Sequence, residues 1–348
     1  MNPLTLIIPT YNRPNFLKRI LSYYSSYDIK FNIIIVDSSI PSNKKLNKKI
    51  LSFFPQLNIL YLDHFSPKLA PHYKYAEMVK YVKSKYVCFC PDDDFIVPNG
   101  IKEAVDFLEK NSDYAAAHGT YISFYVYINS FGSKNFWWKF VYPYNSIASP
   151  NPTRRLISHL TNYYQVLWAV RKTDVVKQAY KGFLKSKVDP YLFGELLPDM
   201  LSLIYGKMKR LNNFYAARQA FSTSYSYWPS LMDAINAGTY ESEYTKFKKC
   251  IVNNLSKISG LSEKKASEII DSSMKIYIKT TRQEHFMGKL NLILSHFPKL
   301  LSSSIRLLHT KYLFSKENQD RIGLINSSSS KYYHDFENIR QSVLNHKI

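Results

Sequence analysis

Short apolar runs alternate with helical patterns of polar and apolar positions through the first 120 residues of the chain. The apolar runs have the length of buried strands and span residues 4–9, 31–36, 57–62 and 86–90. Helical spacing follows each run, three times opened by proline, in residues 14–25, 44–53, 71–83 and 98–109. This alternation predicts an α/β fold with a Rossmann-like, mostly parallel sheet. Strands that are apolar on both faces fit such a sheet, because helices cover both of its sides.

The pattern changes after residue 113. An aromatic strand, a loop and one further short strand are predicted in turn at residues 114–128, 135–152 and 164–170. Residues 191–205 have helical spacing, in which Pro198 favours a break and a helix that starts at Asp199.

The length of 348 residues suggests two domains, or one large domain with an appendage. Helical patterns with serine-rich breaks fill the rear of the chain. We therefore predict a main domain over residues 1–230, made of the halves 1–120 and 121–230, and a helical C-terminal region over 231–348.

Composition excludes several classes of protein. Hydrophobic residues make up 45% of the chain, which is enough for a core and excludes wholesale disorder. Three cysteines are too few for a disulfide scaffold or a four-thiolate zinc site, so a reduced, cytoplasmic protein is expected. The first residues lack the pattern of a signal peptide, and apolar stretches are too short to span a bilayer. We expect a soluble protein or one peripheral to the inner face of the cytoplasmic membrane.

The net charge of +21 is spread unevenly. It amounts to +4 in residues 1–120, +10 in 121–230 and +7 in 231–348. Such an excess attracts a polyanion, an anionic membrane or a phosphate-rich ligand. Residues 285–316 contain five Lys or Arg, no acid, and apolar residues at roughly helical spacing, which is typical of a helix lying on an anionic membrane. An ordinary helix packed on the main domain is the alternative.

Polar residues follow three of the predicted strands at one edge of the sheet. The segments are Thr10-Tyr11-Asn12-Arg13-Pro14, Asp37-Ser38-Ser39 and Pro91-Asp92-Asp93-Asp94. Ligands of open parallel sheets bind at this edge. Three adjacent carboxylates repel one another, and a divalent cation, Mn²⁺ or Mg²⁺, is their natural counter-charge. The alternative is a solvated acidic turn that caps the next helix.

Together with their flanking residues Pro9, Ile35-Val36 and Phe95, these segments resemble the consecutive signatures of GT-A glycosyltransferases of the family-2 type. The resemblance covers residues 3–230, and the Asp-Asp-Asp-Phe form is similar to a branch that builds bacterial surface polysaccharides such as capsule or O-antigen. It implies a nucleotide-binding half followed by an acceptor half. By motif position, the implied nucleotide contacts are Pro9, Thr10, Tyr11, Arg13, Asp37, Ser38, Asp92 and Asp93, and the implied metal ligands are Asp93 and Asp94.

The resemblance also implies a catalytic carboxylate at the start of a later helix. Asp199 matches that position and is the favoured general base, although Pro198 stands where Glu is common, and Glu195 is the alternative. A helix-capping Asp199 is the structural alternative. A base on the face opposite the leaving group implies inversion at the anomeric carbon. Arg218, after the last predicted strand, is a candidate for the diphosphate.

Three aromatic residues are weaker candidates for acceptor binding or for a lid over the nucleotide: Trp168, Tyr227 and Trp228. Core packing is the more favoured role for Trp168. The expected partners are a nucleotide-sugar donor and a saccharide acceptor, including a lipid-linked one.

Two other functions remain open. A nucleotidyltransferase shares such a sheet and an Asp pair, but the first strand lacks a Gly-rich phosphate loop. A non-enzymatic basic protein that binds membrane or nucleic acid would explain the charge, but the acidic triplet would repel a polyanion. Nucleic acid is therefore not an expected partner.

Overall fold

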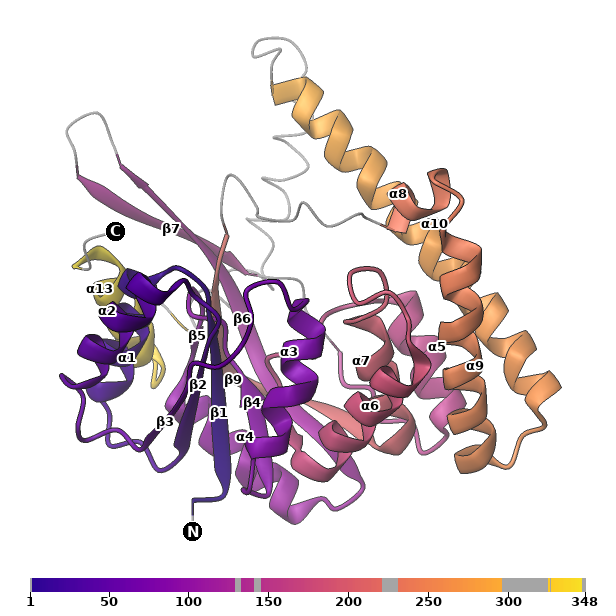
Figure 1. Ribbon diagram of the computed structural model, residues 1–348, viewed down its shortest axis with the longest axis horizontal. Coiled ribbons are helices and arrows are strands. Elements are labelled where there is room, and N and C mark those ends of the chain that lie inside the picture. Colours follow the sequence, from indigo (N-terminus) through magenta and orange to yellow (C-terminus); the bar gives the residue numbers. More distant parts are fainter. Residues whose placement is uncertain are drawn as a thin grey trace.

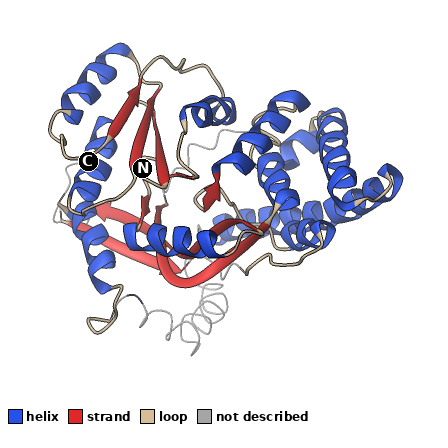
Figure 2. Ribbon diagram, turned by 90° about the horizontal axis from the view of Figure 1, so that it is seen from below, coloured by secondary structure: helices blue, strands red, loops and turns tan. Residues whose placement is uncertain are grey.

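The computed structural model describes residues 2–128, 133–140, 145–220, 231–295, 325 and 327–345. Within these residues a nine-stranded sheet runs through the molecule, with helices on either side of it (Figures 1 and 2). The strand order is β3-β2-β1-β4-β8-β6-β9-β5, and β7 pairs with β6. The predicted α/β fold with a mostly parallel sheet is confirmed.

Four parallel strands form the first part of the sheet: β1 (Leu4–Thr10), β2 (Asn32–Asp37), β3 (Ile59–Leu62) and β4 (Tyr86–Phe89). The register pairs Thr10 with Asp37, so the loops after β1 and β2 emerge side by side. Cys90, just after β4, donates its backbone N–H to Ile7 of β1. The three polar segments therefore meet at one edge, as expected.

Proline opens the four helices of this part: α1 (Pro14–Ser25), α2 (Pro41–Leu51), α3 (Pro71–Met78) and α4 (Pro98–Lys110). Its fixed φ suits the first helical position, where the missing N–H would have no partner inside the helix. A short 3₁₀ turn, η1 (Val79–Tyr81), follows α3.

The second part of the sheet is mixed. It contains β5 (Phe95–Ile96), β6 (Tyr114–Ile128), β7 (Lys134–Phe140), β8 (Val170–Lys172) and β9 (Lys207–Gln219). β6 and β9 are parallel, whereas β7 and β8 both pair antiparallel with β6.

Two strand predictions in this part were wrong. The loop predicted at 135–152 begins as β7, because alternate side chains of that segment pack on a neighbouring helix. The strand predicted at 164–170 is a loop that reaches β8 only at Val170. The apolar character of residues 166–169 reflects burial and not extended pairing.

Two helices were missed, and one was predicted to start too late. The missed helices are α5 (Pro152–Thr161) and α6 (Thr173–Ser186). α7 (Leu196–Tyr205) begins two residues before Pro198, not at Asp199. Proline is tolerated there because the first turn of a helix has no intrahelical partners for its N–H groups.

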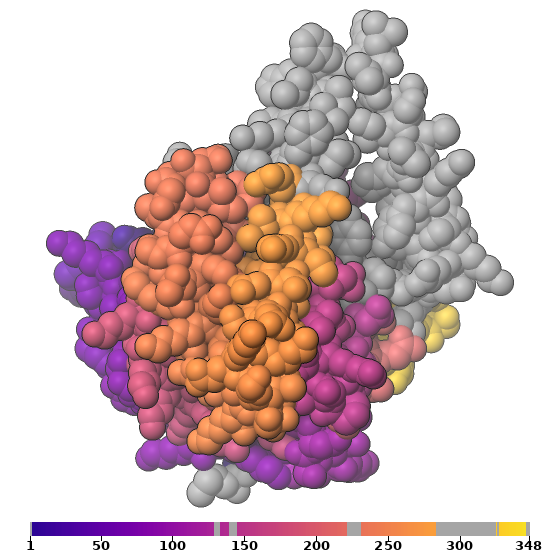
Figure 3. All heavy atoms as spheres, turned by 90° about the vertical axis from the view of Figure 1, so that its right-hand side faces the viewer, coloured from indigo at the N-terminus to yellow at the C-terminus, as the bar shows by residue number. Residues whose placement is uncertain are grey.

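The described residues after 230 are mainly helical, as predicted: α8 (Leu231–Asn236), α9 (Tyr240–Ser259), α10 (Glu263–Ser295) and α13 (Tyr333–Leu344). α9 and α10 lie side by side, as Figure 3 shows, and pack against α5 and α7. α13 returns to α1 and β7 at the opposite end of the sheet (Figure 1).

In the described part of the chain, none of the helices is long and apolar enough to cross a bilayer. Of the expected membrane-binding segment 285–316, residues 285–295 belong to the backbone of α10, and the remainder lies outside the described residues.

Candidate active site

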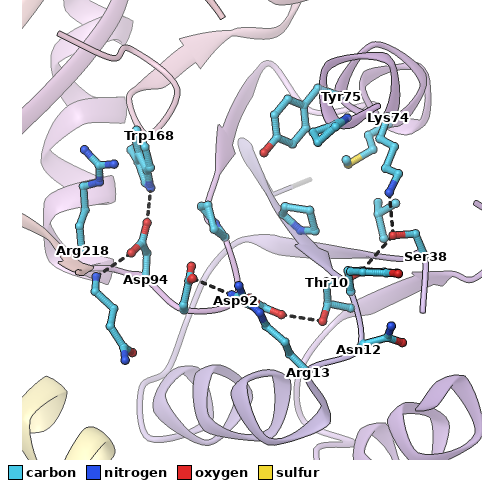
Figure 4. A pocket seen from close by; sticks show the side chains of 18 residues that line it. Thr10, Asn12, Arg13, Ser38, Lys74, Tyr75, Asp92, Asp94, Trp168 and Arg218 are labelled. Carbon is cyan, nitrogen blue, oxygen red and sulfur yellow. Dashed lines mark hydrogen bonds and ion pairs between the residues drawn. The ribbon is translucent and has the colours of Figure 1, made fainter. Parts of the chain in front are cut away.

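A cavity of about 750 Å³ opens at the carboxyl ends of β1, β2 and β4 (Figure 4). Most of the residues expected to bind a ligand line it: Pro9, Thr10, Tyr11, Arg13, Ser38, Asp92, Asp93, Asp94, Trp168 and Arg218. The walls thus combine a basic and aromatic side with an acidic floor.

Asn12 fixes the conformation of the loop after β1. Its φ of +56° is left-handed, a conformation that asparagine tolerates better than most residues. The Asn12 side-chain oxygen accepts hydrogen bonds from the Ile40 backbone N–H (3.0 Å) and from Asn43 Nδ2 (3.1 Å), which ties this loop to the start of α2. The neighbouring Tyr11 is consequently left exposed at the cavity wall.

The first two carboxylates of the acidic triplet are bound to the loop after β1. The Thr10 hydroxyl donates to Asp92 Oδ2 (2.7 Å), and Arg13 Nη1 lies 2.7 Å from Asp93 Oδ2 and 3.3 Å from Asp92 Oδ1. Behind them, the buried Arg19 donates to the Asp93 carbonyl (2.9 Å). The two loops therefore form one rigid unit.

The third carboxylate is oriented from the other side of the cavity. Trp168 Nε1 donates to Asp94 Oδ2 (2.8 Å), and the Gln219 backbone N–H donates to Asp94 Oδ1 (2.8 Å). The Arg218 guanidinium carbon lies 3.7 Å from the centre of the Trp168 ring (Figure 4). Trp168 is buried, as its favoured core role requires, yet it also contacts the predicted metal ligand.

The acidic floor holds three adjacent carboxylates beside the cations of Arg13, Arg19 and Arg218. Burial, and then repulsion by Asp93, raise the pKa values of Asp92 and Asp94 well above the usual range of aspartate. A divalent cation would relieve this repulsion, and carboxylate oxygens are ligands that Mg²⁺ and Mn²⁺ prefer. Across the described residues no cluster of three or more His, Cys, Asp or Glu is arranged to hold a metal. Asp93 and Asp94 are the carboxylates of this floor that would hold a cation.

Asp37 does not line the cavity, although it was expected to contact the nucleotide. It is completely buried, and its carboxylate accepts hydrogen bonds from the Ser39 N–H (2.7 Å), Asn47 Nδ2 (2.7 Å) and the Tyr61 hydroxyl (2.6 Å). Its position supports the β2 loop from behind, and the next residue, Ser38, reaches the cavity instead.

Sequence reasoning missed the contribution of α3. Lys74 Nζ donates to Ser38 Oγ (2.9 Å), and Lys74 and Tyr75 both line the cavity (Figure 4). Burial lowers the pKa of Lys74. A lysine in a helix that follows a strand was a weak signal, because only the turn of the helix decides whether it faces the sheet edge or solvent.

The two candidate bases lie beyond the cavity wall, near the start of α7. Asp199 is buried, accepts the Val166 N–H (3.0 Å) and lies 3.8 Å from Arg171, and burial raises its pKa to about 7. Glu195 accepts hydrogen bonds from the Tyr163 hydroxyl and from Gln165 Nε2 (2.7 Å).

Glu195 is connected to the cavity by hydrogen bonds. The other end of Gln165, Oε1, accepts from Arg218 Nη2 (3.0 Å), and Arg218 lines the cavity. Burial raises the pKa of Glu195, although its hydrogen bonds and Arg218 oppose the shift. Tyr227 and Trp228, the lid candidates, lie outside the described residues.

Comparisons with known proteins agree with this geometry. Residues 5–173 match the family described as glycosyl transferase family 2. No protein among those with curated functions matches the chain. The structure of S. aureus TarS 1-349 is similar, with a TM-score of 0.51, 14% identity, and coverage of 81% of this chain and 74% of that one. For its complex with UDP-GlcNAc the TM-score is 0.54 at 15% identity, with the same coverage.

The likeness to TarS concerns the fold, and the family match includes all three strand-end segments that build the cavity. Residues 5–173 therefore match glycosyltransferase family 2, and the chain is a glycosyltransferase with a GT-A fold.

Proposed function

We propose that this enzyme transfers a sugar from a nucleoside diphosphate to a hydroxyl of a bacterial surface glycan, with inversion and with the help of a divalent cation. The observation that carries the proposal is the acidic floor of the cavity, opposite Tyr11, Ser38 and Lys74. The aromatic base of a nucleotide suits the side with Tyr11, and its diphosphate, through a cation, suits the acidic floor. The complexes of TarS with UDP-GlcNAc and UDP support a donor of this class.

In this proposal, different residues of the cavity wall bind different parts of the donor. Tyr11, Ser38 and Lys74 hold the nucleoside, and Asp92 and Asp93 reach its ribose. Asp93 and Asp94 would hold the cation, which neutralises charge on the leaving diphosphate when bound. Arg218, whose positive charge acts on Asp94, stabilises the same charge.

The acceptor proton goes to a carboxylate at the start of α7. The sequence motif favours Asp199, whereas the contacts favour Glu195, because Gln165 and Arg218 link it to the cavity. Either carboxylate has a pKa raised by burial, which suits a general base working near neutral pH. Attack from the face opposite the diphosphate inverts the anomeric carbon. A cytoplasmic enzyme at the inner membrane face would meet lipid-linked acceptors.

Release of nucleoside diphosphate from UDP-, GDP- and CDP-sugars, measured with Mn²⁺ and lipid-linked or free glycans, tests the activity. Glu195→Gln and Asp199→Asn then identify the base. The variant that lacks the base loses at least about 100-fold in turnover with donor affinity unchanged. Turnover within threefold of wild type in both variants would contradict a base in this region. Binding of DNA or RNA without turnover would favour a non-enzymatic basic protein.

A further inference from the structure

The hairpin formed by β6 and β7 has two different faces. On one face, Phe136 and Trp138 pack against Phe336 of α13, with ring centres 6.0 and 5.1 Å apart. On the other face, Tyr125 and Trp137 form a cross-strand pair with ring centres 5.2 Å apart. Trp137 is 46% exposed, and Tyr127, two residues beyond Tyr125, is 54% exposed. Large aromatic side chains are thus left at the surface although the opposite face of the same strands is covered.

The open face continues the wall of the active site. Ser123 of β6 pairs with Arg218 of β9 in a parallel ladder, so the two side chains lie on the same face of the sheet. Side chains two residues apart also share a face, which places Tyr125 and Tyr127 on the Arg218 side. The hairpin extends outward from there, beyond the body of the molecule (Figure 1). An aromatic surface therefore leads from Arg218, at the cavity, toward the tip of the hairpin.

From this arrangement we infer that Tyr127 and Trp137 form a stacking surface for the sugar rings of a glycan acceptor chain. The inference rests on the proposed function. Tyrosine and tryptophan present a flat apolar ring with a polar edge, which suits the apolar face and hydroxyl rim of a pyranose. Tyr127 lies diagonally across the strand pair from Trp137, and such neighbours are about 7–8 Å apart, so one sugar chain can reach both rings. A chain growing at the cavity would lie along this face.

The competing occupant is a lipid surface, since Tyr and Trp also favour membrane interfaces. The chain offers a matched control for it. Ile128 is 64% exposed at the end of β6 but lies on the opposite face from Tyr127. A glycan that follows the Arg218 face does not contact Ile128, whereas a hairpin inserted in lipid would use both faces.

The test is calorimetric titration of the full chain with cellohexaose, chitohexaose and maltohexaose, and co-sedimentation with phosphatidylglycerol vesicles. The proteins are wild type, Tyr127→Ala, Trp137→Ala and Ile128→Ala. We expect at least one hexasaccharide to bind, and to bind about three- to tenfold more weakly in each aromatic variant but not in Ile128→Ala. Thermal melting checks the fold, and nucleotide affinity in the same variants stays at the wild-type value.

Three results would overturn the inference. In the first, wild type binds none of the hexasaccharides. In the second, Tyr127→Ala and Trp137→Ala both bind a hexasaccharide as tightly as wild type. In the third, wild type binds vesicles and all three variants lose that binding. If wild type binds no nucleotide, the proposed function itself is refuted. This result differs from a failure of the glycan inference alone, in which wild type still binds nucleotide.

Discussion

The ends of β2 and β4 look alike in sequence and differ in the folded protein. β2 ends at an aspartate, and aspartates follow the end of β4 at the same edge of the sheet. Asp37, the last residue of β2, turns inward to Ser39, Asn47 and Tyr61. Asp94, after β4, lines the cavity, held by Trp168 and the backbone of Gln219. One carboxylate supports the loops, and the other is presented to a ligand.

The difference shows that a position at a strand end is not sufficient to place a carboxylate in the cavity. Asn47 and Tyr61 supply neutral donors that bind Asp37 within the protein, and no exposed surface is left on it. The acidic triplet instead lines the cavity, and burial with mutual repulsion raises the pKa values of Asp92 and Asp94 although Arg13, Arg19 and Arg218 lie nearby. A substitution at Asp94 should therefore mainly lower activity, and one at Asp37 should mainly lower stability.

The largest effect is expected for Asp94→Asn. The variant keeps the shape of the side chain but removes the charge, and we expect a loss of about 100- to 1,000-fold in turnover. Its thermal stability should change little, because relief from repulsion by Asp93 offsets the new amide N–H that faces Trp168 Nε1 or the Gln219 N–H. Nucleoside diphosphate release and thermal melting measure the two quantities. Full activity in Asp94→Asn would contradict the role given to the triplet.

Asp37→Asn should lower stability and leave nucleotide binding near the wild-type value. Its new amide would direct an N–H toward donors on Ser39, Asn47 or Tyr61, which costs about 1–3 kcal/mol of unfolding free energy. Chemical denaturation measures this cost. Nucleotide affinity of the folded variant should stay near wild type, and a loss of more than tenfold would return Asp37 to the binding site.

Acid should weaken cation-dependent nucleotide binding. Burial and Asp93 raise the pKa values of Asp92 and Asp94, so protons compete with the cation at higher pH than for ordinary aspartates. Between pH 8 and pH 6, competition by one proton at a pKa of about 7 should lower the affinity by about tenfold in all. Titrations at four pH values with Mn²⁺ test this. An affinity that does not change with pH would show that Asp92 and Asp94 stay ionised without a bound cation, and would contradict this prediction.

The smallest effect is expected at the β2 side of the cavity. Lys74→Met keeps the length of the side chain and loses the hydrogen bond to Ser38, and nucleotide affinity should fall by about three- to tenfold. Lys80→Met is the matched control, because Lys80 is exposed and pairs with Glu77. Equal affinities in the two variants would remove Lys74 from the site.

The sequence predicted the nucleotide-binding half better than the half that follows it. Apolar runs and helix-opening prolines identify β1 to β4 and most of their helices, because the residues within each of these short elements determine its structure. β7 was missed because its pairing with β6 and its packing on Phe336 join distant segments. α5 carried a local signal, since Asn151 caps it and Pro152 opens it, but the surrounding aromatic residues favoured a loop.

The candidate site shows the same division. Thr10, Arg13 and the acidic triplet were predicted to be neighbours because parallel strands bring their ends together. Lys74, Gln165 and Gln219 could not be predicted, because a helix turn, a loop and a backbone N–H place them. No motif encodes such contacts.

The most direct test of the central claim is calorimetric titration with UDP, GDP, CDP and CMP. The titrations are run with Mn²⁺, with EDTA, and in Asp94→Asn with Asp37→Asn as the control. The account predicts that one nucleotide binds in Mn²⁺, at least about tenfold more weakly in EDTA or in Asp94→Asn, and unchanged in Asp37→Asn. Binding that ignores EDTA and Asp94, or no binding of any nucleotide, would contradict it.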